Sequence, residues 1–243
     1  LDAMERLFKT EGSTIAAMLI EPMMGNCVGM MPEPGYLEGL RRLCDEYGSL
    51  LIFDEVKTGF RMALGGAHEI FGVTPDMGTF AKSMGNGFPV AAVAGRRDVM
   101  DAWAHGGVTQ AGTYSGNGVA VAAASATIDL LVTGEPLARV EKVGTALMEG
   151  VASICAAQSV PVHVLGHPSM IGVFFAEDRP TDFRDTAWHD AELYEAVIVG
   201  MIARGVMPVD DGLEPWFTSA AHSDEDVATT LQAFEEALID AKA

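Results

Sequence analysis

Short apolar runs alternate with amphipathic stretches along this chain, and two of the runs pass directly into acidic residues. Residues 15–20 form a continuous apolar run that ends at Glu21, and residues 50–53 form another that ends at Asp54. An apolar run of this length, without polar alternation, suits a strand that is buried on both faces of a parallel sheet. Together with the intervening helical stretches, these runs predict an α/β protein with a mainly parallel sheet.

The remaining elements follow from periodicity and from glycine and proline punctuation. A helix is expected to begin at Pro34-Gly35 and to end at Gly48, because proline suits the first turn of a helix and glycine its end. Further helices are expected at 117–132, 135–158, 187–204 and 224–242, and further strands at 78–81, 90–94, 162–165 and 171–176. The sequence Thr133-Gly-Glu-Pro136 separates two of the helices, so we place a domain boundary after residue 134.

Composition limits the classes of partner. The net charge of −19 leaves no basic surface for nucleic acid and disfavours an anionic membrane. The three cysteines have no C-x-x-C spacing, so we expect free thiols in a reducing compartment and no metal site. No apolar run has transmembrane length and no signal peptide opens the sequence, which predicts a cytoplasmic protein.

Lys82 is the only charged residue between Asp76 and Arg96, in a stretch that is otherwise apolar and rich in glycine. An unpaired ammonium group is costly to bury, so it lowers its pKa, finds an anionic partner or forms a covalent bond. A desolvated lysine is the form that condenses with a carbonyl group. The stretch therefore suggests a reactive lysine held out of water, and the alternative is a side chain that extends from a strand end to solvent.

Asp54 and Lys82 each follow an expected strand, and ligands of open α/β sheets bind at that end of the strands. A carboxylate beside a carbonyl-binding lysine suggests pyridoxal phosphate, whose ring nitrogen needs an anion opposite it. Glu55 could supply the same charge, but strand alternation puts Glu55 with Phe53 on the other side. A helix-capping or turn role is the alternative for Asp54.

A loop of glycines, hydroxyl residues and an asparagine, 112–117, precedes the helix expected at 117–132. Its hydroxyl and backbone N–H groups, together with the helix N-terminus, suit an anion such as a phosphate. A plain N-cap is the alternative for the same residues.

Several motifs stand in an order that resembles a known enzyme family. They include Asp54-Glu-Val-Lys-Thr-Gly-Phe-Arg61 and Ala81-Lys-Ser-Met-Gly-Asn-Gly-Phe-Pro89. The other matching segments are 19–22, 34–41, 51–53, 71–76, 95–100, 110–117 and 213–222. The set resembles the fold-type I, class III aminotransferases, and within them the subgroup around glutamate-1-semialdehyde aminomutase. This resemblance implies that residues 1–134 are the C-terminal part of the large domain that binds pyridoxal 5′-phosphate (PLP), and that 135–243 are a smaller α+β C-terminal domain.

The resemblance also implies roles for individual residues. Lys82 would form the Schiff base with the cofactor and shuttle the proton, and Asp54 would pair with the pyridinium nitrogen. Val56 would pack on one face of the ring. Thr113 would bind the cofactor phosphate, usually that of the neighbouring subunit, which implies a homodimer. Glu214 is a candidate for the substrate site, and a plain surface glutamate is the alternative.

Members of the family usually run to well over four hundred residues, and this chain resembles only their C-terminal portion. The upstream phosphate loop and the aromatic residue that stacks on the ring have no counterpart here. The resemblance therefore implies a missing N-terminal half or a separate N-terminal chain. We expect residues 1–243 alone not to bind PLP tightly.

The sequence predicts a PLP-dependent aminotransferase that moves an amino group between an amine or amino acid and an oxo acid or aldehyde. The 82–89 loop is less glycine-rich than that of the aminomutase, and Asp210-Asp211 adds negative charge before Glu214, so intramolecular amino transfer of the aminomutase type is the alternative. An inactive scaffold fragment is the alternative of another class. A dinucleotide-binding oxidoreductase is excluded, because no G-x-G-x-x-G follows a strand.

Overall fold

The structure is a computed structural model that describes residues 1–105 and 107–242. The chain divides into two compact units. The first contains Leu1–Pro22 and Pro32–Gly134, and the second contains Met23–Met31 and Glu135–Ala243. The sequence was expected to divide after residue 134, with all of 1–134 in one domain. The structure instead places the segment Met23–Met31 in the second unit. It belongs to the second unit because its apolar side chains are buried there.

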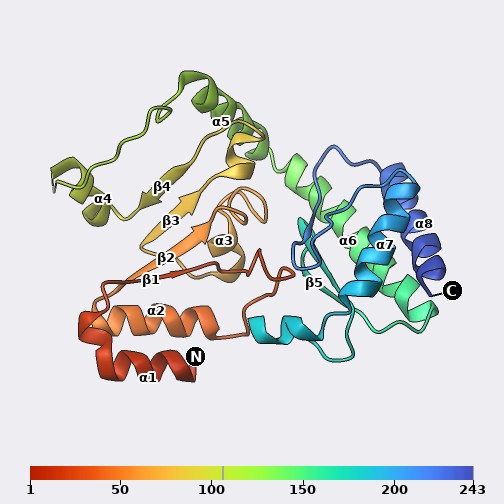
Figure 1. Cartoon of the computed structure of the whole chain (residues 1–243). Coiled ribbons are helices and arrows are strands. Elements are labelled where there is room, and N and C mark those ends of the chain that lie inside the picture. The colour runs from red at the N-terminus through yellow and green to blue at the C-terminus, as the bar shows by residue number, and fades with distance from the viewer. Residues whose placement is uncertain (106, 243) are drawn as a thin grey trace. The chain divides into compact units, whose positions relative to one another are not determined.

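A four-stranded sheet forms the centre of the first unit (Figure 1). Its strands, in the order β1-β2-β3-β4, are Ala17–Ile20, Leu50–Glu55, Met77–Phe80 and Ala92–Gly95. The first three are parallel, and β4 runs antiparallel to β3. The sheet is therefore mainly parallel, as the apolar runs predicted. Because β2 and β3 are parallel neighbours, their carboxyl ends lie at the same edge of the sheet.

Two helices cover one face of this sheet (Figure 1). They are α1, Asp2–Glu11, and α2, Tyr36–Tyr47. Gly35 and Gly48 flank α2 with φ angles of 82° and 73°, a left-handed conformation that glycine adopts readily. The predicted helix between these glycines is confirmed. The core beneath the two helices comprises Phe8, Leu37, Leu40, Leu43, Cys44, Leu51, Phe53 and Val73.

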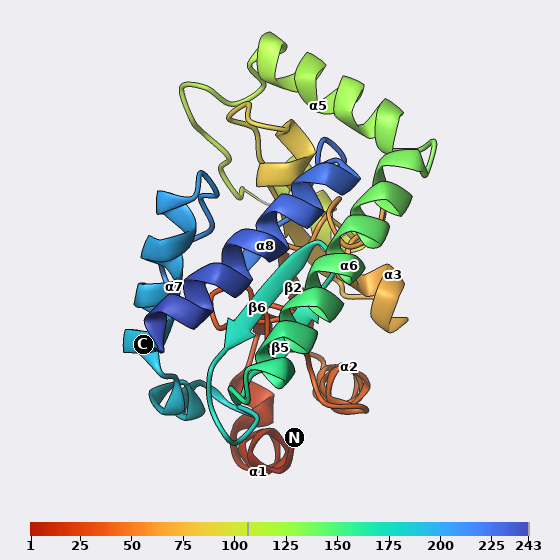
Figure 2. The ribbon, with the colours of Figure 1, turned by 90° about the vertical axis from the view of Figure 1, so that its right-hand side faces the viewer.

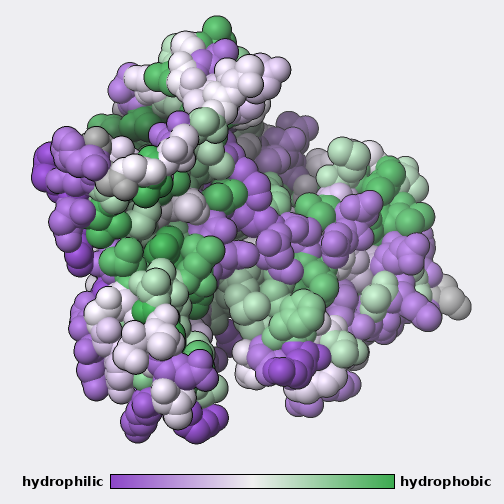
Figure 3. Space-filling model, turned by 60° about the vertical axis from the view of Figure 1, so that its left-hand side comes forward, coloured by the Kyte–Doolittle hydropathy of each residue, from purple (hydrophilic) through white to green (hydrophobic). Residues whose placement is uncertain are grey.

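The prediction that the first apolar run forms a fully buried strand is wrong. Strand β1 is an edge strand, and its side chains alternate between exposed and half-buried positions. Met18 and Ile20 pack against the core, whereas Leu19 faces the other way and is 64% exposed. A space-filling view from the side of the first unit shows apolar surface between polar areas (Figure 3). The continuous apolar run therefore correctly predicts a strand here, but it does not show that both faces of the strand are buried.

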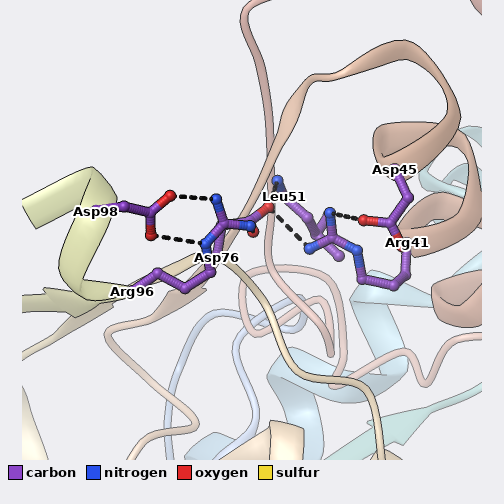
Figure 4. Close-up of polar contacts among 6 residues, drawn as sticks. All are labelled: Arg41, Asp45, Leu51, Asp76, Arg96 and Asp98. Carbon is purple, nitrogen blue, oxygen red and sulfur yellow. Dashed lines mark hydrogen bonds and ion pairs between the residues drawn. The ribbon is translucent and has the colours of Figure 1, made fainter.

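An ion-pair network joins the elements at the amino end of β3 (Figure 4). The carboxylate of Asp76, which is 2% exposed, accepts hydrogen bonds from Arg41 at 2.8 Å, from Arg96 at 2.6 Å and from the backbone N–H of Leu51 at 2.7 Å. Buried carboxylates are tolerated when they are paired and hydrogen-bonded in this way. The network ties α2, β2 and the start of β3 together.

Three further helices belong to the first unit: α3, Ala67–Phe71; α4, Arg97–His105; and α5, Gly118–Leu131. Helix α5 packs against the short 3₁₀ turn Lys82–Gly85 that follows β3. This contact brings the loop before α5 into the same part of the unit as the carboxyl end of β3.

The second unit is an antiparallel sheet packed with helices (Figure 2). Its strands are β5, His163–His167; β6, Met170–Phe174; and β7, Trp216–Phe217, and its helices are α6, Glu135–Ala157; α7, Ala191–Ala203; and α8, Asp224–Ala241. The core side chains include Val143, Val151, Ile171, Val197 and Phe234. This arrangement is the smaller α+β portion that the sequence predicted.

The segment Met23–Met31 is fixed within the second unit by close packing. Cys27, Val28 and Met30 are buried against side chains of β5 and β6. The backbone N–H of Val28 donates to the carbonyl of Leu213 at 2.7 Å. A Cβ atom at Gly172 would lie 1.8 Å from the carbonyl oxygen of Val28, so only glycine fits there.

Candidate active site

Asp54 is the last residue but one of β2 and is half-buried. Its Oδ1 atom accepts two hydrogen bonds, from the backbone N–H of Val56 at 3.0 Å and from Oγ1 of Thr79 at 3.1 Å. Among the described residues, no hydrogen bond reaches Oδ2. Asp54 therefore presents one carboxylate oxygen that is held by the fold and one that can accept a further donor.

Glu55 occupies the opposite face of β2 and has a different role. It is 1% exposed and shares the buried face with Phe53, as strand alternation predicted. Its carboxylate accepts hydrogen bonds from Thr58 Oγ1 at 2.5 Å and from the first backbone N–H groups of α3, at Ala67 and His68, at 2.8 and 3.1 Å. Glu55 thus stabilises the start of α3, and Asp54 is the carboxylate of the pair that is open to a ligand.

Lys82 begins the 3₁₀ turn Lys82–Gly85, two residues after the end of β3. Its φ angle is 44°, a left-handed conformation that is uncommon outside glycine and is found at functional sites. The expectation that Lys82 is held out of water is wrong for this structure, because its side chain is exposed. The buried positions of the turn are Met84 and Gly85, so the chain turns inward only after the lysine.

Ser83, the next residue, carries a feature that the sequence did not reveal. Its Oγ atom is buried and has no hydrogen-bond partner in the part of the chain that the structure describes. A buried hydroxyl without a partner is costly, and in native structures such groups call for an explanation. Serine is common after strands, so no signal in the sequence distinguishes this one.

A pocket of about 380 Å³ lies at this end of the sheet in the first unit. Val56 and Thr79 line it together with Pro89–Val93 and Tyr114–Asn117. The structure therefore brings Val56, Thr79 and the loop before α5 around one space. Val56 and Thr79 are the two residues that donate hydrogen bonds to Asp54. Lys82 follows Phe80, which also lines the pocket, by two residues.

The loop before α5 places Thr113 in an exposed turn. The N-cap of α5 is Asn117, whose Oδ1 accepts the backbone N–H groups of Val119 and Ala120 at 3.1 Å each. Two donors at the helix N-terminus are thereby used by the chain itself. Anion binding in this loop would depend on the turn that contains Thr113 and on the remaining N–H groups rather than on the whole helix N-terminus.

Glu214 lies in the second unit and the other candidates lie in the first. It is half-buried in a turn just before β7, where its backbone N–H donates to the carbonyl of Asp211 at 3.0 Å. The neighbouring Leu213 accepts the hydrogen bond from Val28. The backbone directly before Glu214 is therefore held by its hydrogen bond to the segment Met23–Met31.

Other classes of site are not supported in residues 1–105 and 107–242. No cluster of three or more His, Cys, Asp or Glu side chains there could hold a metal ion. Cys27, Cys44 and Cys155 are buried, and none of them forms a disulfide bond within these residues. No single helix in those residues is both long and apolar enough to cross a membrane.

Comparisons with known proteins show what the chain is similar to. It is 41% identical, over all of its 243 residues, to a glutamate-1-semialdehyde 2,1-aminomutase from Syntrophobacter fumaroxidans. Its structure is similar to that of an omega-transaminase from Sphaerobacter thermophilus, with a TM-score of 0.92, 30% identity and coverage of the whole chain. It is also similar to the PLP internal aldimine form of the FumI protein from Sphingopyxis sp. MTA144, with a TM-score of 0.87, 26% identity and 98% coverage.

The chain spans 55–56% of the length of these three proteins. A family model for class-III aminotransferases matches residues 1–238. PLP is the cofactor of this family. The sheet topology, the match over nearly the whole chain and the similarity to solved transaminases agree, and the chain belongs to the class III aminotransferase family.

Proposed function

We propose that this chain carries the catalytic lysine and the ring-binding carboxylate of a PLP-dependent aminotransferase. The enzyme would move an amino group between an amine or amino acid and an oxo acid or aldehyde. One observation carries the proposal: Asp54, with an available Oδ2, and Lys82 lie at the carboxyl ends of the neighbouring parallel strands β2 and β3, at the edge where such sheets bind ligands.

The residues of the first unit fit the cofactor by their chemistry. Oδ2 of Asp54 is an anionic acceptor suited to a protonated ring nitrogen. Val56, whose backbone N–H donates to Asp54, offers an apolar surface in the adjoining pocket. Lys82 is an exposed residue, and a lysine amine is the group that condenses with an aldehyde. When bound, PLP supplies an aldehyde that receives amino groups and a ring that withdraws electrons from the reacting bonds.

The residues would act in separate roles. Lys82 would hold the cofactor aldehyde and then move a proton at Nζ, as a general base that returns the proton as an acid. Asp54 would pair with the ring nitrogen of the cofactor through Oδ2. Closure of the site by residues outside this chain would exclude water from Lys82, which is exposed here. We infer such residues because the chain spans 56% of its curated relative, either in an N-terminal half or in a separate N-terminal chain.

We further propose that the enzyme is a homodimer and that Thr113 binds the phosphate of the cofactor held by the neighbouring subunit. The exposure of Thr113 supports this, as do the exposed apolar side chains Val119, Val121, Leu130 and Val132 on and just after α5. Residues 1–134, apart from Met23–Met31, would then form part of the cofactor-binding domain, and 135–243 would form the small domain together with Met23–Met31. The three free cysteines favour a cytoplasmic location.

Intramolecular amino transfer is the second candidate function, because the curated relative at 41% identity is a glutamate-1-semialdehyde 2,1-aminomutase. Glu214 would contact the substrate in either reaction. Product analysis separates the two. A transaminase stops after half a cycle without an external oxo acceptor, whereas an aminomutase completes its cycle without one.

The proposal is tested by attaching the cofactor irreversibly. The complete protein is incubated with PLP, reduced with sodium borohydride and digested, and the peptides are analysed by mass spectrometry. We expect the pyridoxyl adduct on Lys82 in wild type and in Lys9→Ala, which changes an exposed lysine of α1. No adduct is expected at this position in Lys82→Ala. Wild-type protein without any adduct would instead support the inactive scaffold.

A further inference from the structure

Thr79 lies directly opposite Asp54 in the register of the parallel strands β2 and β3. Its hydroxyl donates to Oδ1 of Asp54 at 3.1 Å, the same oxygen that accepts the backbone N–H of Val56 at 3.0 Å. We propose that Thr79 is a positioning residue, which fixes the Asp54 carboxylate so that Oδ2 is the oxygen offered to the cofactor ring nitrogen. This inference rests on the proposed function.

The two donors restrict rotation of the Asp54 carboxylate about its last side-chain torsion. The last torsion of an aspartate side chain is broad, so a carboxylate held by one hydrogen bond can still rotate. One donor comes from the turn after β2 and the other from β3, so Oδ1 is held by two separate parts of the chain. Both donors bond to the same oxygen, so Oδ2 is left as the oxygen that can accept a further donor. A carboxylate oxygen held in one direction is a suitable partner for the protonated ring nitrogen of the cofactor.

The hydroxyl of Thr79 is used differently from four other threonine hydroxyls in this unit. Those of Thr10, Thr14, Thr127 and Thr133 donate to backbone carbonyls three or four residues earlier, which are local interactions. Thr79 instead donates to a carboxylate on another strand, and it also lines the pocket. Its branched side chain restricts the direction of the hydroxyl, and valine would fill the same space without the donor.

Thr58, in the turn that follows β2, provides a matched control. Its hydroxyl donates to Glu55, the residue after Asp54, at 2.5 Å, but this carboxylate is buried and holds the start of α3. Loss of the Thr58 hydroxyl should therefore lower the stability of the protein. Loss of the Thr79 hydroxyl should weaken the binding of PLP.

The experiment compares wild type, Thr79→Val, Thr79→Ser and Thr58→Val in the complete protein with PLP as the probe. We expect Thr79→Val to raise the dissociation constant of PLP about tenfold, since hydrogen bonds to charged groups contribute at about this level. The pH midpoint of the bound-cofactor absorbance should shift, and kcat should fall more than KM rises. Thr79→Ser should restore the affinity to within about threefold, and Thr58→Val should lower the unfolding midpoint without changing PLP affinity.

The outcomes separate this inference from the function on which it rests. Wild-type protein that binds no PLP would overturn the proposed function. Wild type and Thr79→Val with equal PLP affinity and equal pH midpoints would overturn the positioning role alone. A loss in Thr79→Ser as large as in Thr79→Val would also overturn it, because packing rather than the hydroxyl would then be responsible.

Discussion

The polar groups at the two ends of the first unit's sheet differ in how fully they are hydrogen-bonded. At the amino end of β3, both oxygens of Asp76 are occupied by hydrogen bonds from two arginines and a backbone N–H. At the carboxyl end, Asp54 uses one oxygen, Lys82 is exposed with a left-handed backbone, and Ser83 keeps a buried hydroxyl without a partner among the described residues. Satisfied groups hold a fold together, whereas unsatisfied and strained groups gather where ligands bind.

The largest expected effect is on turnover and comes from the carboxyl end. Lys82→Ala in the complete protein should lower the rate of amino transfer by about three orders of magnitude or more, because the nucleophile and proton carrier are lost together. Half-reaction kinetics with an amino donor measure this. The unfolding midpoint of the cofactor-free protein should not fall, since the side chain is exposed. Full activity in this variant would refute the mechanism.

The amino end should show the largest effect on stability. Asp76→Ala leaves Arg41 without its buried partner and the N–H of Leu51 without its acceptor, and should cost about 3 kcal/mol. Denaturant unfolding of the complete protein measures the loss. Asp45→Ala is the control, because this exposed partner of Arg41 should cost less than about 0.5 kcal/mol. Equal losses in the two variants would show that the buried network does not stabilise the sheet.

The adjacent carboxylates sharpen the comparison within one strand. Glu55→Gln should destabilise the protein by about 2 kcal/mol, because three donors lose a charged acceptor. Asp54→Asn should change stability by less than about 1 kcal/mol but weaken PLP binding and slow amino transfer. Unfolding and PLP titration of both variants check the pattern. If Asp54→Asn were the more destabilising change, the division of roles between the two residues would be wrong.

The smallest expected effect has the opposite sign. Ser83→Ala removes a buried hydroxyl that has no partner in the described residues, and should stabilise the cofactor-free protein by about 1 kcal/mol. Ser49→Ala is the matched change, because its buried hydroxyl donates to the carbonyl of Ile15 at 2.6 Å, and it should destabilise by about 1 kcal/mol. Thermal unfolding measures both. Destabilisation by Ser83→Ala would show that its hydroxyl is already bonded.

The sequence predicted what local patterns determine. Apolar runs located β1 and β2, and the glycines at 35 and 48 gave the limits of α2. Alternation along β2 separated Asp54 from Glu55, because the two faces of a strand are set by the backbone alone. These features need no knowledge of distant partners.

The features that the sequence did not predict depend on contacts between residues that are far apart in the chain. An apolar run does not reveal whether it lies at the edge of a sheet, so the exposure of Leu19 was not predicted. The hydrogen bonds around Asp76 link partners that are 20 to 35 positions apart. The place of Met23–Met31 in the second unit depends on packing against β5 and β6. The bond between Thr79 and Asp54 required the strand register.

The central claim is that the carboxyl ends of β2 and β3 bind the cofactor. The most direct measurement is a crystal structure of the complete protein grown with PLP. The account predicts electron density that is continuous from Lys82 Nζ to the cofactor, with Oδ2 of Asp54 in hydrogen-bond contact with the ring nitrogen and Oδ1 still bonded to Thr79. A cofactor bound at another lysine, or a ring nitrogen that faces a group other than Asp54, would contradict it.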